Sequence, residues 1–188
     1  MEDFIEHIKK ILSRRERRII KNTSFSHAAV LVPIFKKNKD CHILFTKRTE
    51  QVKHHKGEIS FPGGMADKED YDLKRTALRE AFEEVGLKQE DVEILGALDD
   101  IVTVTEFIVT PYVGIFPYPY PFKLSSVEIE ELIEVPISHL LKKECFSERE
   151  IERMGRKELV YSYQYKNHII WGATARILKQ FLDLIFND

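Results

Sequence analysis

The sequence predicts one α/β domain of the mixed (α+β) kind, with strands in groups and helices between and after them. Short apolar segments of strand character are bounded by polar turns, and three other segments carry apolar residues at helical spacing. The 188 residues, 43% of them apolar, suit one domain with a sizeable core. Because strand and helix do not alternate regularly, we expect a mixed sheet, and neither a helical bundle nor a regular βαβ fold.

Residues 3–20 predict an N-terminal helix. Their apolar residues stand at helical spacing: Phe4, Ile5, Ile8, Ile11 and Leu12. The segment ends in the basic run 14–18, which we interpret as an exposed helix end, with phosphate or partner binding as the alternative. We expect residues 1–26 to form a helical extension and residues 27–188 a single domain.

Apolar strand-like segments follow this helix. Residues 27–35 and 41–48 flank the polar turn "KKNK" and predict a hairpin. Further strands are expected at 91–100, 107–116 and 131–136, and a second hairpin at 158–165 and 168–172, turning at Lys166 and Asn167. The last segment predicts a helix with one apolar stripe: Ile177, Leu178, Phe181, Leu182 and Ile185.

A central helix is predicted over residues 72–85. Its expected buried stripe comprises Leu73, Ala77, Leu78, Ala81, Phe82 and Val85. Either Asp70 or Asp72 suits the N-cap, and Gly86 suits the position after the helix, with Leu87 as the apolar contact beyond it.

Three acids, Glu80, Glu83 and Glu84, crowd one turn of the polar side of this helix. Like charges at these spacings repel by a few tenths of a kcal/mol per pair, and Arg79 relieves only part of the repulsion. A solvated acidic face would explain a lone pair of acids, but clustered carboxylates also suit Mg²⁺ or Mn²⁺. Just upstream, Gly63 and Gly64 permit close approach of the backbone to a ligand. Strand, glycine loop and acidic helix together could hold a metal–diphosphate complex.

The stretch from Gly64 to Leu87 resembles the Nudix box, G-x5-E-x7-R-E-U-x-E-E-x-G-U, where U is a bulky aliphatic residue. It departs in three places: Ala81 is small for U, Asp70 stands for Glu, and eight residues instead of seven separate Asp70 from Arg79. The last two departures are expected in the branch of coenzyme A pyrophosphatase-like Nudix hydrolases.

That branch has a second motif upstream, L-L-T-x-R-S-x7-G-x3-F-P-G-G. Residues 44–64, "LFTKRTEQVKHHKGEISFPGG", are similar to it with the spacing kept throughout, Phe45 standing for Leu and Thr49 for Ser. The resemblance covers roughly residues 27–182.

The resemblance implies a Nudix-type α/β/α sandwich over residues 27–188. It also implies Mg²⁺- or Mn²⁺-dependent hydrolysis of a diphosphate bond in coenzyme A or acyl-coenzyme A, giving adenosine 3′,5′-bisphosphate and (acyl-)phosphopantetheine. Glu80 and Glu84 would be the principal metal ligands and Glu83 a third, with the Gly63 carbonyl a possible addition. Glu80 could be ligand, general base or both, and Arg79 would orient the acids.

The loop before the glycine turn collects positive charge that could hold substrate phosphates. We expect Arg48, Lys56, Gly63 and Gly64 to bind substrate, Arg48 by bidentate contact. For the other basic residues of the loop, a solvated surface is the preferred interpretation: Lys53, His54 and His55.

Several residues keep open interpretations. Trp171 is expected to pack in the core or at the domain edge, with base stacking as a minor alternative. Glu128 could add a ligand or a base, although a solvated strand edge is preferred. The run "FPYPYPF" at 116–122 is expected to expose its tyrosines and to wall a cleft or a dimer contact.

Three functional hypotheses remain. The first is a coenzyme A pyrophosphatase. The second is a Nudix hydrolase of another compound, such as ADP-ribose, a dinucleotide or a nucleoside triphosphate. The third is a non-catalytic nucleotide-binding module. The intact acids count against the third hypothesis, and the upstream motif favours the first over the second.

The composition limits which kinds of binding partner and which cellular compartment we expect. The net charge of −2 indicates no nucleic-acid partner and no anionic membrane, and no apolar run is long enough to span a bilayer. Cys41 and Cys145 share no short motif, which suits a reduced cytoplasmic protein. We therefore expect a cytoplasmic enzyme, possibly a homodimer, with a small-molecule nucleotide substrate.

Overall fold

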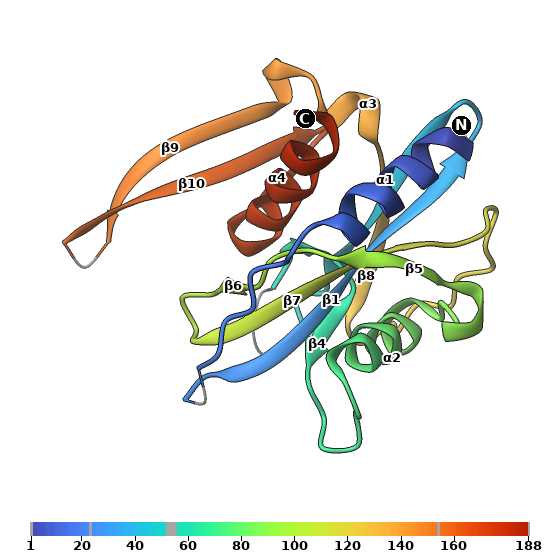
Figure 1. Cartoon of the computed structure of the whole chain (residues 1–188), viewed down its shortest axis with the longest axis horizontal. Helices are drawn as coiled ribbons and strands as arrows, with labels where there is room; N and C mark the ends of the chain where they lie inside the picture. Colours follow the sequence, from blue (N-terminus) through green and yellow to red (C-terminus); the bar gives the residue numbers. More distant parts are fainter. Residues whose placement is uncertain (1, 23, 52–55, 154, 188) are drawn as a thin grey trace.

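The computed structural model describes residues 2–22, 24–51, 56–153 and 155–187, and its centre is a mixed sheet (Figure 1). The helices are α1 (Glu2–Arg14), α2 (Leu73–Val85), α3 (Ile137–Leu140) and α4 (Gly172–Phe186). The strands are β1 (Ser26–Lys37), β2 (Asp40–Arg48), β3 (Ile59–Ser60), β4 (Gly63–Met65), β5 (Glu93–Ala97), β6 (Ile101–Val102), β7 (Phe107–Ile115), β8 (Ile129–Pro136), β9 (Phe146–Arg153), β10 (Arg156–Tyr165) and β11 (His168–Trp171).

The main sheet has eight strands in the order β3-β2-β1-β7-β5, with β4 also paired to β1, β6 to β7 and β8 to β2. Strands β1 and β7 run parallel over nine residue pairs, whereas the other pairings are antiparallel. A smaller sheet has the order β11-β10-β9. The predicted mixed sheet is confirmed.

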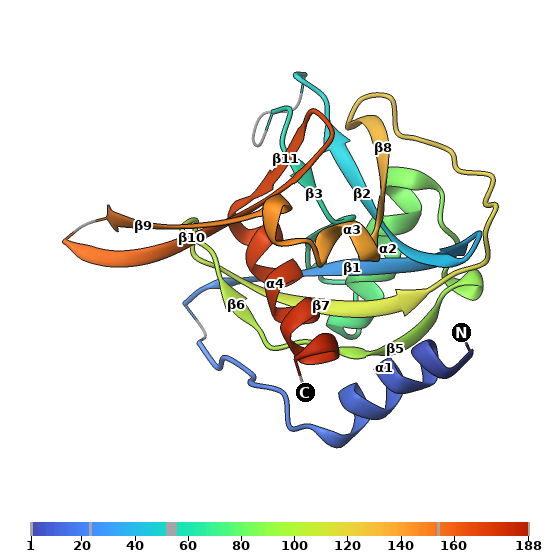
Figure 2. The same ribbon diagram turned by 90° about the horizontal axis from the view of Figure 1, so that it is seen from above.

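Alternation along β1 separates the two faces of the main sheet, because successive side chains of a strand point to opposite sides. Leu31 and Phe35 join the hydrophobic cluster under α2, while Val32 and Ile34 join the cluster that includes α1 and α4. Figure 2 shows α2 on one side of the sheet and α4 on the other. These three layers confirm the expected α/β/α sandwich.

Both predicted hairpins are confirmed. Strands β1 and β2 pair around a turn with Asn38 in the left-handed region, and β10 and β11 pair around a turn at Lys166 and Asn167. Strand β9 was not predicted, because its sequence of alternating acids and arginines lacks the apolar alternation that signals a half-buried strand. With β10 it forms an arm that extends beyond the body of the protein (Figure 1, Figure 2).

The N-terminal helix is shorter than predicted, and of the basic run only the exposed Arg14 belongs to its end. Helix α1 ends at Arg14, and the residues that follow bind two acids beyond β5. Arg15 pairs with Asp99, and Arg17 Nη1 donates to Asp100 Oδ1 over 2.7 Å. The same two acids also accept from the backbone N–H groups of Arg18 and Ile20, so the segment after the helix is held against the chain beyond β5.

Helix α1 packs its buried Ile5, Ile8 and Leu12 into the same cluster as α4. The expected division between an extension at residues 1–26 and a domain at 27–188 stays a prediction. In α4 the predicted stripe is confirmed, since all five of its residues are buried. Within the described ranges, no helix is both long and apolar enough to cross a membrane.

The aromatic run at 116–122 does not expose its tyrosines, contrary to the prediction. Its aromatic residues are buried or half-buried, whereas its prolines are exposed. Phe116 is buried, Tyr118 stacks on Phe35 at 4.7 Å between ring centroids, and the Tyr120 hydroxyl donates to Asp91 over 2.7 Å. The run closes the hydrophobic cluster beside α2.

Candidate active site

Helix α2 begins and ends where the sequence indicates. The Asp72 side chain accepts a hydrogen bond from the Arg75 backbone N–H at 2.7 Å, so Asp72 and not Asp70 is the N-cap. Gly86 takes the left-handed conformation with φ of 72° after the last turn, and Leu87 beyond it is fully buried. The caps at the two ends of α2 fix the position of the turn that carries the acids, which lies against β1 and β4.

Of the six positions of the predicted apolar stripe of α2, four are buried, Leu73 is half-buried against the same cluster, and one is wrong. Leu78, Ala77, Ala81 and Val85 are buried, but Phe82 is 54% exposed. The place on the buried face is taken by Glu84 instead. Glu84 stands three residues after Ala81 and seven after Ala77, a spacing that puts it on the side facing the sheet.

The three acids of α2 therefore lie in different environments. The side chain of Glu84 is 2% exposed, that of Glu80 17% and that of Glu83 55%. The prediction that all three lie on the polar side of the helix is wrong for Glu84. One carboxylate of the cluster is a core group and must be neutralised or bonded where it lies.

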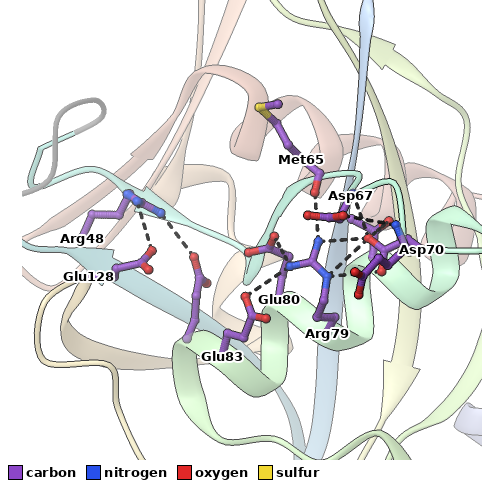
Figure 3. Close-up of polar contacts among 11 residues, drawn as sticks. Arg48, Met65, Asp67, Asp70, Arg79, Glu80, Glu83 and Glu128 are labelled. Atoms are coloured by element: carbon purple, nitrogen blue, oxygen red, sulfur yellow. Dashed lines mark hydrogen bonds and ion pairs between the residues drawn. The ribbon is translucent and has the colours of Figure 1, made fainter.

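Arg79 ties the outer acids to the loop before the helix (Figure 3). Its Nη1 donates to Glu80 Oε1 at 2.8 Å and to Glu83 Oε2 at 3.2 Å, and its Nη2 donates to the Met65 carbonyl at 3.0 Å. On the other side Arg79 holds Asp70, with Nη2 3.0 Å from Oδ2 and Nε 3.2 Å from Oδ1. Arg79 thus sets the position of the Glu80 carboxylate.

Asp70 is nearly enclosed and fully bonded. Its side chain is 3% exposed and also accepts from the Thr76 hydroxyl at 2.9 Å and the Asp67 backbone N–H at 3.0 Å. The Arg79 guanidinium holds the pKa of Asp70 down to about 2. The shorter acid, set one residue further from Arg79 than in the Nudix box, therefore still reaches its arginine.

Glu84 has one incomplete partner. Arg48, at the end of β2, donates from Nη1 to Glu84 Oε1 at 3.2 Å and lies 3.5 Å from Glu128 Oε2 through Nη2. Among the described residues, the buried Glu84 Oε2 has no hydrogen-bond partner. Burial outweighs the attraction of Arg48 and raises the pKa of Glu84 to about 8, with Glu80 and Glu128 acting in the same direction. Burial also raises the pKa of Glu80.

The glycine turn lies against these acids. A Cβ added to Gly64 would stand 2.5 Å from Glu80 Cδ, and one added to Gly63 would stand 2.4 Å from the Ala29 carbonyl oxygen. Both residues pair with β1, Gly63 opposite Val30 and Gly64 opposite Ala29. Glycine is required here because neither the strand nor the carboxylate leaves space for a side chain.

These residues fit a divalent cation. The described residues contain no preformed group of three metal-ligating side chains. The buried Glu84 Oε2 nevertheless lacks a partner, Glu80 lies one helical turn before it, and the donors are oxygens, the ligands that hard divalent cations prefer. Glu83 lies outside this group, since it is exposed and paired with Arg79.

Other predicted residues lie apart from the acids or differ from expectation. Lys56 is exposed, and Lys53, His54 and His55 lie outside the described residues. Trp171 is 50% exposed and not a core residue; with Lys47 and Glu131 it lines a cavity of about 400 Å³.

Glu128 is more than a solvated strand edge. Its carbonyl accepts from the Thr49 backbone N–H at 2.9 Å, which places its carboxylate facing Arg48. Sequence spacing gave no signal for this contact.

A three-layer sandwich with an acid-bearing loop and helix defines a hydrolase of the kind that acts on diphosphates. The NUDIX domain model matches residues 25–152. The chain belongs to the Nudix family and is a Nudix hydrolase, a family of pyrophosphatases acting on nucleoside diphosphate compounds and typically using divalent metals.

Similar proteins agree with this assignment. The chain is 36% identical over 180 residues to the uncharacterized Nudix hydrolase NudL of Photorhabdus laumondii, covering 96% of this chain and 95% of the relative. It is 39% identical to NudL of Pectobacterium atrosepticum, covering 81% and 79% of the two chains. Among solved structures, a MutT/nudix family protein from Enterococcus faecalis has a TM-score of 0.58 at 12% identity, over 94% of this chain and 67% of that one, which supports the fold.

Proposed function

We propose that this hydrolase cleaves the diphosphate bond of coenzyme A or acyl-coenzyme A with Mg²⁺ or Mn²⁺, giving adenosine 3′,5′-bisphosphate and (acyl-)phosphopantetheine. The buried Glu84 carboxylate, with one oxygen unpartnered beside Glu80, carries the proposal for the reaction. The resemblance of residues 44–64 to the upstream motif supports the choice of coenzyme A, and Arg48 and Gly64 of this segment lie against the same acids.

Each residue then has a task. Glu84 and Glu80 would hold the cation, with Glu83 and the Gly63 carbonyl as further candidates. When bound, such a cation neutralises diphosphate charge and lowers the pKa of water. Arg79 holds Glu80 in place, and Gly64 leaves the room that Glu80 needs. Glu80 would also serve as general base, and burial raises its pKa. Arg48 and Lys56 would contact substrate phosphates.

Cellular setting and assembly are further parts of the proposal. Cys41 and Cys145 are both free and buried, which suits a reducing cytoplasm. The homodimer stays part of the proposal without support from the aromatic run at 116–122, whose rings pack on the protein's own hydrophobic cluster.

The experiment is a substrate panel. The protein is incubated with Mg²⁺ or Mn²⁺ and coenzyme A, acetyl-coenzyme A, ADP-ribose, NADH and ATP, and the products are identified by mass spectrometry. We expect adenosine 3′,5′-bisphosphate from the first two at the highest kcat/KM. Preference for ADP-ribose, a dinucleotide or a triphosphate would move the enzyme to another Nudix substrate class. Binding without turnover of any compound would indicate a non-catalytic module.

A further inference from the structure

Arg48 makes an unusual pair with Glu84. The guanidinium is only partly enclosed at 22% exposure, while its partner carboxylate is almost fully buried. The contact is made by one nitrogen and one oxygen, 3.2 Å apart. Within the described part of the chain, Arg48 Nε and Glu84 Oε2 are both buried and have no hydrogen-bond partner. An arginine–carboxylate pair normally gains its strength from two parallel hydrogen bonds, and here one of the two is missing.

Arg48 is held so that it can serve either of two acids. Its backbone N–H donates to the Glu58 carbonyl at 3.0 Å, which fixes the end of β2. From this point Nη1 reaches the buried Glu84. Nη2 faces the half-exposed Glu128 (Figure 3). Glu128 is itself fixed through its carbonyl to Thr49. The guanidinium therefore stands between an inner acid and an outer acid.

We propose that Arg48 is a resident cation of the metal site. It compensates the Glu84 carboxylate while no divalent ion is bound, and it moves to Glu128 and to substrate phosphate when Glu84 takes the ion. This inference rests on the proposed function only in requiring a divalent ion at Glu84. It assigns Arg48 a positioning role beyond the expected substrate contact.

The geometry has a thermodynamic consequence. A divalent ion on the open Oε2 of Glu84 would share that carboxylate with the Arg48 guanidinium, and the two positive charges repel each other, so ion binding is weaker than the acids alone would give. Once displaced, Arg48 becomes free to bind phosphate, so ion and diphosphate binding strengthen each other by the same factor. The site would then favour the loaded ion–diphosphate complex over either component alone.

The test measures ion affinity without substrate. Mg²⁺ is titrated calorimetrically into the parent and into Arg48→Ala at pH 8.5, where competition from protons is reduced. We expect Arg48→Ala to bind Mg²⁺ about tenfold more tightly, which corresponds to about 1.4 kcal/mol. Without Mg²⁺, in chelator, the same variant should melt at a lower temperature than the parent because Glu84 loses its counter-charge.

Lys47→Ala is the matched control. Lys47 precedes Arg48 on β2 and carries the same charge, but it pairs with the exposed Glu130 and lines the cavity beside Trp171. We expect its Mg²⁺ affinity to stay within about twofold of the parent, the screened effect of one surface charge. Should Arg48→Ala fail to fold, Arg48→Gln removes the charge while keeping hydrogen-bond donors, and we expect the same tighter binding.

The outcomes separate the two proposals. One outcome is that Arg48→Ala binds Mg²⁺ as tightly as the parent or more weakly, while Glu84→Gln abolishes Mg²⁺ binding. This outcome overturns the proposal that Arg48 is a resident cation, but it supports the metal site at Glu84. An equal gain in Lys47→Ala also overturns it, since net charge would then explain the effect. If the parent itself binds no divalent ion, both the metal site and the role of Arg48 fail.

Discussion

The two arginines that bind the acids of α2 differ in how completely they are bonded. Arg79 holds Asp70 through two nitrogens, reaches Glu80, Glu83 and the Met65 carbonyl, and leaves the enclosed Asp70 fully satisfied. Arg48 makes one short contact to Glu84 and one long contact to Glu128. A saturated pair is a structural support, whereas an unsaturated buried pair keeps capacity for a ligand.

Glu84→Gln should produce the largest effect in this comparison. The amide keeps the shape of the carboxylate but is a poorer metal ligand, so we expect kcat to fall by more than about 100-fold. Above about pH 8, where Glu84 is ionised, the metal-free variant should be as stable as the parent or slightly more stable, because a buried charge is removed. Activity assays with saturating Mg²⁺ and unfolding in chelator measure both effects.

Glu83→Gln is the matched control on the same helical turn. Because Glu83 is half exposed and bound to Arg79, its loss should reduce kcat much less. An equal loss in both variants would contradict the distinction between the buried and the exposed acid.

Asp70→Asn tests the saturated pair. Removing one partner of a buried ion pair typically costs about 3 kcal/mol or more, and the freed Arg79 would no longer hold Glu80 in place. We expect a clear loss in the free energy of unfolding, measured by urea denaturation, and a loss in kcat of about tenfold or more. Glu69→Gln, on the exposed loop beside Asp70, should change neither the free energy of unfolding nor kcat. If Asp70→Asn also changed neither, the Asp70–Arg79 pair would have no structural role.

Asp70, in the saturated pair, and Glu84, in the unsaturated pair, should also change the stability of the protein in opposite directions with pH. The pKa of Asp70 is lowered to about 2 from an ordinary value of 3.8, so its stabilisation is present above about pH 4 and is lost as pH falls toward 2. The pKa of Glu84 is raised to about 8 from 4.5, so its contribution is present below about pH 4.5 and is lost as pH rises through 8. In chelator, the free energy of unfolding of the parent should therefore fall relative to Glu84→Gln between pH 5 and 9. A constant difference between the two proteins across this range would contradict the burial of a titrating Glu84.

Phe82→Ala should have the smallest effect. Because Phe82 is more than half exposed, its truncation should change the free energy of unfolding by no more than about 0.5 kcal/mol. Leu78→Ala, one turn earlier and buried, is the comparison and should cost about 2–5 kcal/mol. Thermal or urea unfolding distinguishes them, and similar losses would mean that Phe82 packs in solution.

The sequence predicts the framework of the site well because local chemistry determines it. Gly86 ends α2 since it alone accepts the left-handed conformation cheaply, and Ala77 and Ala81 mark the buried face by their spacing. Glu84 could not be placed, because an acid in a run of acids is normally solvated. Its burial results from the close approach of the glycine turn and β2, a tertiary contact between segments 36 residues apart. The roles assigned to Glu80, Glu83, Glu84, Arg79 and Arg48 stay predictions.

The arm of β9 and β10 has a consequence for aggregation. Strand β9 is the terminal strand of the small sheet, and such an edge can recruit a strand from another molecule. Its exposed Glu148, Arg149 and Glu150 place charges along that edge. In an antiparallel pairing centred on Glu150, Glu148 of one copy would face Glu152 of the other, so like charges oppose the association. The same charges that hide β9 from sequence-based recognition as a strand oppose this pairing along the edge of a protruding ribbon.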